Sequence, residues 1–181
     1  MQNTQTEIKV FLASSSELEL ERIYIGDFFT DINSNITETS VRVRLLKWEV
    51  FDPSFKGTRK QSEYDQQIQK SDIFIALFRT KAGKYTMEET EVAKAAHSEN
   101  KKPHELYCLM QDWQEEREFD ADAIKAELGA DFTTDTFADI EDLKRKIIKI
   151  LMPHLCAHGV TITETDMFIQ INAINIIRKQ G

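Results

Sequence analysis

The sequence contains few of the residues that mark special classes of protein. It has two cysteines, Cys108 and Cys156, six glycines and three prolines in 181 residues. Two distant cysteines do not make a disulfide framework, so we expect a reducing, cytoplasmic location. Glycine and proline are too sparse for a low-complexity linker. No stretch approaches the roughly 20 consecutive apolar residues that a membrane-spanning helix needs, and the N-terminus lacks the apolar core of a signal peptide.

Positive charge is also in deficit. Lys and Arg number 23 against 31 Asp and Glu, so the formal net charge is −8. Binding to nucleic acid or to an anionic membrane needs a basic surface, and we therefore expect neither partner. The rest of the composition, with 41% hydrophobic and 30% charged residues, is typical of a globular protein.

Five short stretches have the composition of β-strands, and a helical pattern follows each of them. The third stretch, residues 73–78 (IFIALF), is continuously apolar, which is typical of a strand covered on both faces in a parallel sheet. This alternation predicts right-handed crossovers and an α/β fold, namely a flavodoxin-like, doubly wound, five-stranded parallel sheet with flanking helices. The predicted strands are residues 8–13, 41–50, 73–78, 105–110 and 132–137. The predicted helices begin near Ser16, Gln61, Thr86, Ala121 and Asp139, and the last of them ends at Pro153.

The C-terminal residues fall outside this alternation. We assign residues 1–155 to the α/β domain and residues 156–181 to a C-terminal extension, either helical or a linker to a further domain. Met167, Ile171, Ile174 and Ile177 are spaced as in an amphipathic helix that covers an edge of the domain or makes an oligomer contact.

Ligands of doubly wound sheets bind at the carboxyl ends of the strands. Three loops of unusual composition follow predicted strands there: a serine-rich loop at residues 13–16, an aromatic and charged loop at residues 48–58, and a basic loop with glycine at residues 78–86. A serine-rich turn that opens a helix can present backbone N–H groups to an anion such as a pyrophosphate. The serines can equally be ordinary helix caps.

Of three neighbouring glutamates, Glu89 is the one predicted to face the sheet. At about 100° per residue it lies in the same arc as Val92, Ala93 and Ala96, whereas Glu91 points to solvent. A carboxylate near apolar side chains at the start of a helix is placed as many catalytic carboxylates are.

A structural explanation of Glu89 stays open. Thr86 and Glu89 match the T-x-x-E capping box, in which the glutamate bonds the backbone amide of the first residue. A metal site is not expected, because His154 and His158 stand at a predicted helix end, where cations favour the helix dipole.

Two stretches of the sequence resemble bacterial Toll/interleukin-1 receptor (TIR) domains. Residues 71–78 (SDIFIALF), followed by Tyr85-x-x-x-Glu89-x-x-x-Ala93, are similar to the third strand and third helix of that family. Residues 10–22 (VFLASSSELELER) are similar to the first strand and helix of bacterial members. The resemblance implies the flavodoxin-like fold. It also implies cleavage of NAD to nicotinamide and an ADP-ribose product in antiphage defence, with NAD as substrate and no cofactor.

The resemblance also implies roles for particular residues. Glu89 is the expected catalytic residue, where its carboxylate would stabilise the positive charge that develops on the ribose as nicotinamide leaves. An aromatic side chain is expected to stack on the base, and loop cations are expected to contact the pyrophosphate. The expected nucleotide-binding residues are Leu12, Ala13, Ser14, Ser15, Trp48, Phe78, Arg79, Lys84 and Tyr85.

Two other functions are compatible with these observations. One is a non-catalytic module that acts through TIR–TIR contacts, and self-association is expected for the enzyme as well, because TIR enzymes typically need assembly. The other is a nucleoside or nucleotide N-glycosidase or deoxyribosyltransferase-like enzyme, which also directs a carboxylate at a glycosidic bond.

Overall fold

The centre of the molecule is a parallel β-sheet. A computed structural model describes residues 5–37, 39–46, 59–112, 116, 118, 120–165 and 167–178. Its five central strands have the order β2-β1-β3-β4-β5, and each neighbouring pair is parallel. This is the flavodoxin-like order, so the predicted fold class is confirmed. The strands are β1 (Thr6–Ser14), β2 (Val41–Leu46), β3 (Ile73–Phe78), β4 (Glu105–Gln111) and β5 (Phe132–Phe137).

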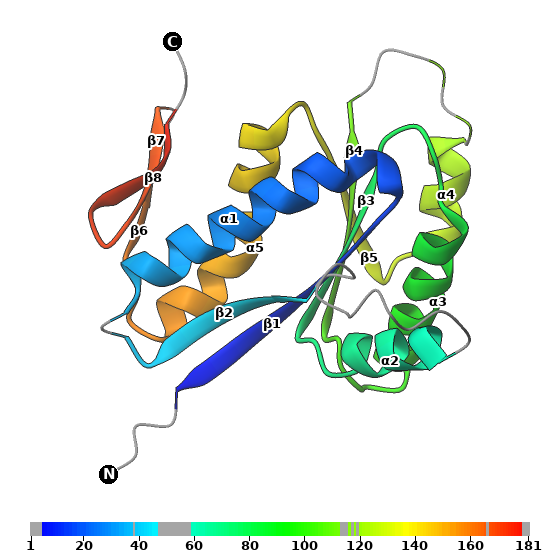
Figure 1. Cartoon of the computed structure of the whole chain (residues 1–181), viewed down its shortest axis with the longest axis horizontal. Helices are drawn as coiled ribbons and strands as arrows, with labels where there is room; N and C mark the ends of the chain where they lie inside the picture. The colour runs from blue at the N-terminus through cyan, green and yellow to red at the C-terminus, as the bar shows by residue number, and fades with distance from the viewer. Residues whose placement is uncertain are drawn as a thin grey trace.

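Helices cover both faces of the sheet (Figure 1). One face carries α1 (Glu19–Asn35), which follows the short 3-10 turn η1 (Ser16–Leu18), and α5 (Ile140–Ala157). The other face carries α2 (Arg59–Ile68), α3 (Lys84–Ser98) and α4 (Ala121–Leu128). Helix α5 continues through Pro153 to Ala157, so the predicted end of that helix at Pro153 is wrong.

Each face of the sheet has its own hydrophobic core. Successive residues of β1 point to opposite faces: Val10 and Leu12 belong to the core under α1 and α5, and Phe11 and Ala13 belong to the core under α2, α3 and α4. All six residues of β3 are buried, as its continuous apolar run predicts. Each large apolar side chain contributes about 1.5–3 kcal/mol to the stability of the fold when it is fully buried. The two cores therefore hold the strands in place, and the strands determine where the loops at their ends meet.

The C-terminal extension is a small antiparallel sheet and not a helix. Its strands are β6 (Ile162–Glu164), β7 (Phe168–Ile171) and β8 (Ile174–Arg178), in that order. Ile169, Ile171 and Ile177 are buried in the same core as α1 and α5, while Ile174 is exposed. The extension therefore covers the outer side of the α1–α5 layer (Figure 1).

The tight turn between β7 and β8 carries an unfavourable residue, which gives a first prediction. Asn172 and Ala173 form it with φ of 47° and 68°, and Ile171 pairs with Ile174 across it. A left-handed conformation costs an alanine roughly 1–2 kcal/mol, which glycine avoids. After the extra entropy that glycine has in the unfolded chain, Ala173→Gly is expected to stabilise the protein by about 0.5 kcal/mol in urea denaturation. Ala173→Val is the counterpart, and a stability equal to that of wild type in both variants would contradict this reading of the turn.

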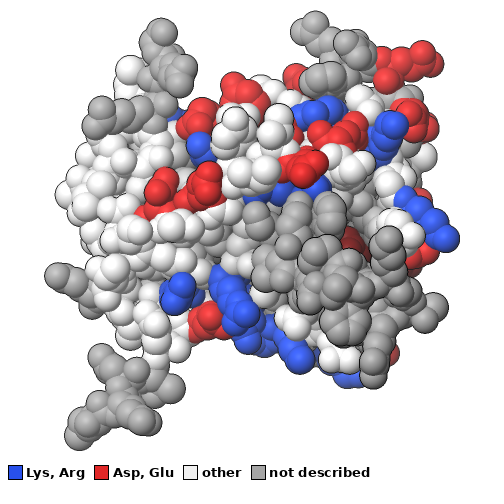
Figure 2. All heavy atoms as spheres, viewed as in Figure 1, with Lys and Arg blue, Asp and Glu red and all other residues white. Residues whose placement is uncertain are grey.

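Figure 2 shows the charge on one face of the molecule. Acidic side chains are spread over its upper part with basic side chains among them, and a band of basic side chains lies below the centre of this view. Within the described ranges, no helix has the length and apolar character needed to cross a membrane.

Candidate active site

A buried arginine holds the turn that follows β1. Arg22 in α1 is fully buried, and its Nη1 donates hydrogen bonds to Ser14 Oγ (2.6 Å) and to the Ser15 carbonyl oxygen (2.8 Å). Ser15 precedes η1 but does not cap it with its side chain. Its Oγ instead donates to Glu17 Oε1 at 3.0 Å. The serines of this turn are thus part of a polar network, and the expectation of an ordinary serine cap is wrong for Ser15.

Glu17 joins the turn after β1 to the loop after β3. Its Oε1 accepts the backbone N–H groups of Thr80 and Lys81, both at 3.0 Å, and its Oε2 accepts the Thr80 hydroxyl at 2.5 Å. Burial acts to raise the pKa of Glu17, but the hydrogen bonds from Thr80, Lys81 and Ser15 outweigh it and hold the pKa below its usual value. Glu17 is therefore an ionised anchor between two loops.

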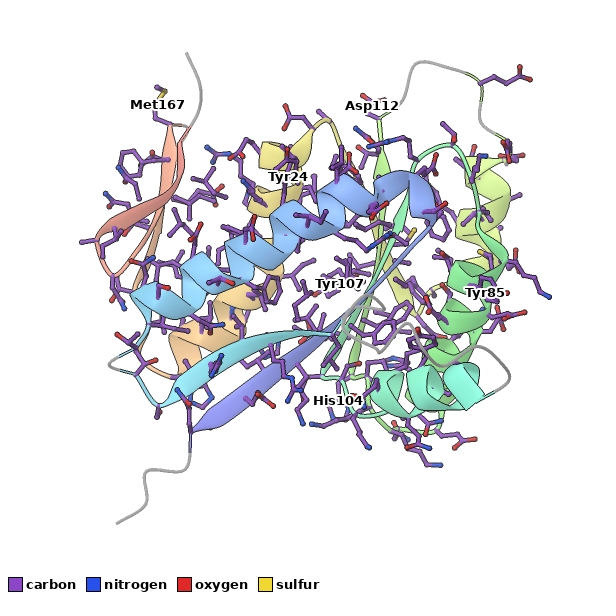
Figure 3. The ribbon with its side chains drawn as sticks, viewed as in Figure 1. Tyr24, Tyr85, His104, Tyr107, Asp112 and Met167 are labelled. Atoms are coloured by element: carbon purple, nitrogen blue, oxygen red, sulfur yellow. The ribbon has the colours of Figure 1, made fainter. Side chains whose placement is uncertain are left out.

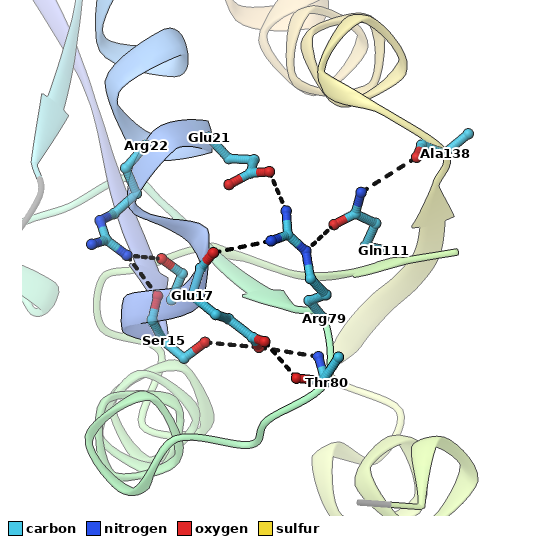
Figure 4. A network of polar contacts seen from close by, with 9 residues as sticks. Ser15, Glu17, Glu21, Arg22, Arg79, Thr80, Gln111 and Ala138 are labelled. Atoms are coloured by element: carbon cyan, nitrogen blue, oxygen red, sulfur yellow. Dashed lines mark hydrogen bonds and ion pairs between the residues drawn. The ribbon is translucent and has the colours of Figure 1, made fainter. Parts of the chain in front are cut away.

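Arg79 extends this network to the neighbouring strands (Figure 4). Its guanidinium donates to the Glu17 carbonyl oxygen, forms an ion pair with Glu21, and donates through Nε to Gln111 Oε1. Gln111 in turn donates to the carbonyl oxygen of Ala138, beyond β5. The side chain of Arg79 is 17% exposed. In this arrangement the guanidinium of Arg79 contacts protein partners, and its expected contact with a pyrophosphate stays a prediction.

Helix α3 begins against the turn after β1. Its first residue is Lys84 and its N-cap is Gly83, three residues before Thr86, the predicted N-cap. A Cβ added to Gly83 would lie 3.3 Å from Ser15 Cβ, so only a residue without a side chain fits easily there. Thr86 lies inside the helix, and among the described residues no side chain caps the start of α3. The capping box that would have given Glu89 a purely structural role is therefore not formed.

Glu89 faces the sheet, as its position on the helix predicts. It is 8% exposed, whereas Glu91 is exposed. Burial is the main cause that raises the pKa of Glu89 to about 8; the negative charges of Asp65 and Glu88 also raise it, and the charge of Arg22 lowers it. Among the described residues, no hydrogen bond reaches this carboxyl. At neutral pH it is therefore mostly protonated and not committed to a protein partner.

The other predicted nucleotide-binding residues divide into two groups. The side chains of Leu12, Ala13 and Phe78 lie in the cores and are at most 1% exposed, so a contact of these residues with a nucleotide, which stays a prediction, would have to come from their backbone. Tyr85 is 70% exposed and projects from the outer side of α3 (Figure 3). Lys84 is exposed and lies 3.6 Å from Glu88. Trp48 lies outside the described residues.

Two charged residues near Glu89 were missed by the sequence analysis. Arg22 has a signal in the sequence, because it interrupts the apolar stripe that runs from Leu18 in η1 to Ile25 and Phe29 on α1. A charge in such a stripe needs a buried partner. Asp65 of α2 acts on Glu89 through its charge, and nothing in its local sequence marks it.

A shallow hollow separates α2 from α3. Glu89 is not among the residues that line this hollow, so the hollow does not open directly onto the buried carboxyl. Its lining residues are Asp65, Lys84, Met87, Glu88, Glu91 and Val92. In the part of the chain that the structure describes, no three His, Cys, Asp or Glu residues are grouped as metal ligands would be.

The comparisons with known proteins give a similarity in structure but none to a family model. No protein-family model and no curated protein matches the chain. Among solved structures, the chain is similar to the CMP N-glycosidase BcmB of Clostridium botulinum, with a TM-score of 0.48, 15% sequence identity, and coverage of 79% of this chain and 99% of that chain. At that TM-score and identity, the similarity establishes neither a shared substrate nor a shared reaction.

Proposed function

We propose that this protein cleaves the N-glycosidic bond of a nucleotide, with Glu89 as the catalytic carboxyl group. The observation that carries the proposal is the buried, inward-facing carboxyl of Glu89 on α3, a helix that begins against the turn at the carboxyl end of β1. This is the edge at which doubly wound sheets bind their ligands. A group held protonated by burial at such an edge is suited to general acid catalysis at neutral pH.

The proposed reaction uses one carboxyl in two protonation states. The bond between C1′ and the base nitrogen breaks, and its electron pair goes to the base, which takes the Glu89 proton. The resulting carboxylate then stabilises the positive charge on the ribose. Water adds to C1′ and returns a proton to Glu89, so the products are the free base and the sugar phosphate.

Two classes of nucleotide fit this chemistry differently. A neutral nucleobase is a poor leaving group without a proton, so the raised pKa of Glu89 favours a nucleoside monophosphate as substrate. The nicotinamide of NAD leaves without a proton, and its positive charge would lower the pKa of Glu89 on binding. The resemblance of residues 10–22 and 71–93 to bacterial TIR domains supports NAD as the substrate.

Self-association is part of the proposal, because the TIR resemblance implies that an assembled form is the active one. Three exposed apolar side chains on α1 offer a surface for it: Leu20, Ile23 and Tyr24, which are 64%, 44% and 49% exposed. Their spacing places them on one face of the helix.

The proposal is tested by incubating the concentrated protein with NAD, with each of the four common ribonucleoside monophosphates and with the matching nucleosides, with and without a crowding agent. Released base is separated by chromatography. We expect release from at least one nucleotide and less from its nucleoside, because the phosphate contributes binding energy. A folded, assembled protein that releases no base from any of them would favour the non-catalytic interaction module.

A further inference from the structure

Arg22 is an unusual residue for the interior of a domain. Among the described residues it has the largest side chain that is fully buried. Burial of a guanidinium is unfavourable unless hydrogen bonds and opposite charge compensate for it. Two of its acceptors, Ser14 Oγ and the Ser15 carbonyl oxygen, belong to the turn at the carboxyl end of β1 (Figure 4). Arg22 thus fixes the turn that borders the candidate site.

The same turn supports the start of α3. Gly83, the N-cap of α3, sits so close to Ser15 that an added Cβ would be 3.3 Å from Ser15 Cβ and 3.7 Å from Ser15 Cα. Ser15 therefore packs beside the start of α3, and a shift of Ser15 toward Gly83 would press on the first turn of the helix that carries Glu89. Arg22 is thus connected to the helix that carries Glu89 through its hydrogen bonds to the Ser14–Ser15 turn and the packing of Ser15 against Gly83.

Arg22 also acts on Glu89 by its charge. Three charged groups face the Glu89 carboxyl: Arg22 from α1, Asp65 from α2 and Glu88 from α3 itself. The two acids favour the protonated carboxyl, and Arg22 is the group among the three that favours the carboxylate. In the proposed reaction, the carboxylate is the form left after the proton has passed to the base.

We propose that Arg22 is a positioning residue of this site: it holds the Ser14–Ser15 turn against the start of α3 and places a positive charge beside Glu89. The inference rests on the proposed function for its catalytic meaning. The coupling between Arg22 and Glu89 is measurable without any turnover.

The test is a titration of Glu89 by NMR in protein with carboxyl-labelled glutamate, where the Glu89 signal is assigned by its loss in E89Q. Arg22→Lys keeps the charge, and Arg22→Gln keeps a hydrogen-bond donor but removes the charge. We expect the midpoint of Glu89 to stay near that of wild type in R22K and to rise by about one pH unit in R22Q. Nucleotide cleavage by R22Q should fall about tenfold, mainly in kcat, because the carboxylate product of proton transfer is less stable.

Arg79→Gln is the matched control, since Arg79 is a second arginine at this edge whose partners are Glu17, Glu21 and Gln111. It should leave the Glu89 midpoint unchanged. Equal midpoints in R22K and R22Q would overturn the inference. If R22Q does not fold, the NMR signal of the Arg22 Nε–H group in wild type is followed instead. This signal should shift with the same midpoint as the titration of Glu89. A signal that does not move across that titration would overturn the inference. Undiminished cleavage by E89Q would instead overturn the proposed function and leave these titrations unaffected.

Discussion

Glu89→Gln is expected to lower kcat/KM for the cleaved nucleotide by about 10²–10⁴-fold. The amide keeps the shape of the side chain, but it cannot donate a proton to the leaving base and cannot become the carboxylate that stabilises the ribose cation. The variant should fold, because Glu89 is 8% exposed and no described residue hydrogen-bonds its carboxyl. The measurement is base release under the conditions in which wild type is active.

Glu91→Gln provides the matched control. It changes the same functional group on the same helix, two residues away, where the side chain is exposed. We expect its kcat/KM to stay within about twofold of wild type, because a solvated carboxylate gains little from its surroundings. Equal losses in both variants would mean that the orientation of Glu89 toward the sheet does not matter for cleavage.

Glu89→Gln is also expected to stabilise the protein at alkaline pH. The pKa of Glu89 is raised from its usual value of 4.5 to about 8 in the folded state, so between these values the folded chain binds more protons than the unfolded chain. Wild-type stability must therefore fall as pH rises through this window, by up to about 1.4 kcal/mol per pH unit from this one group. E89Q lacks this titrating carboxyl, so its stability does not fall for this reason as the pH rises.

Urea denaturation of wild type and E89Q at several pH values measures this difference. The two proteins should have similar stability at about pH 5, and E89Q should be more stable by several kcal/mol at about pH 9. A gain that accompanies a loss of activity is the pattern expected where a functional group is held in an unfavourable environment. If the stability difference does not change with pH, Glu89 does not have the raised pKa on which the acid role depends.

The sheet was predictable because its signals are local. The continuous apolar run of β3 and the alternation of β1 between two cores depend on residues adjacent in the chain. The inward orientation of Glu89 followed from helical geometry in the same way. Local composition thus defined the layers and the direction of one important side chain.

The C-terminal extension shows where local spacing fails. Ile171, Ile174 and Ile177 are three residues apart, as in a helix, but a turn at Asn172 and Ala173 separates the first from the other two. The left-handed conformation of Ala173 is rare for that residue, and the sequence gives no reason to expect it. The helical spacing was therefore a coincidence, because it joined residues that belong to two different strands.

The role of Arg79 depended on distant residues. A loop arginine after a strand is open to a phosphate, but here Glu21 and Gln111 occupy its guanidinium, and they lie on α1 and β4. The predicted start of α3 was also wrong, and the residue that precedes the helix, Gly83, lies where Ser15 would crowd a side chain. Neither fact is visible without the tertiary structure.

Release of base from nucleotides by the wild-type protein and by E89Q, followed side by side at equal concentration, tests the central claim most directly. Wild type should produce free base and the corresponding sugar phosphate in equal amounts, and E89Q should produce almost none. Equal release by the two folded proteins, or none by wild type from any nucleotide, would contradict it.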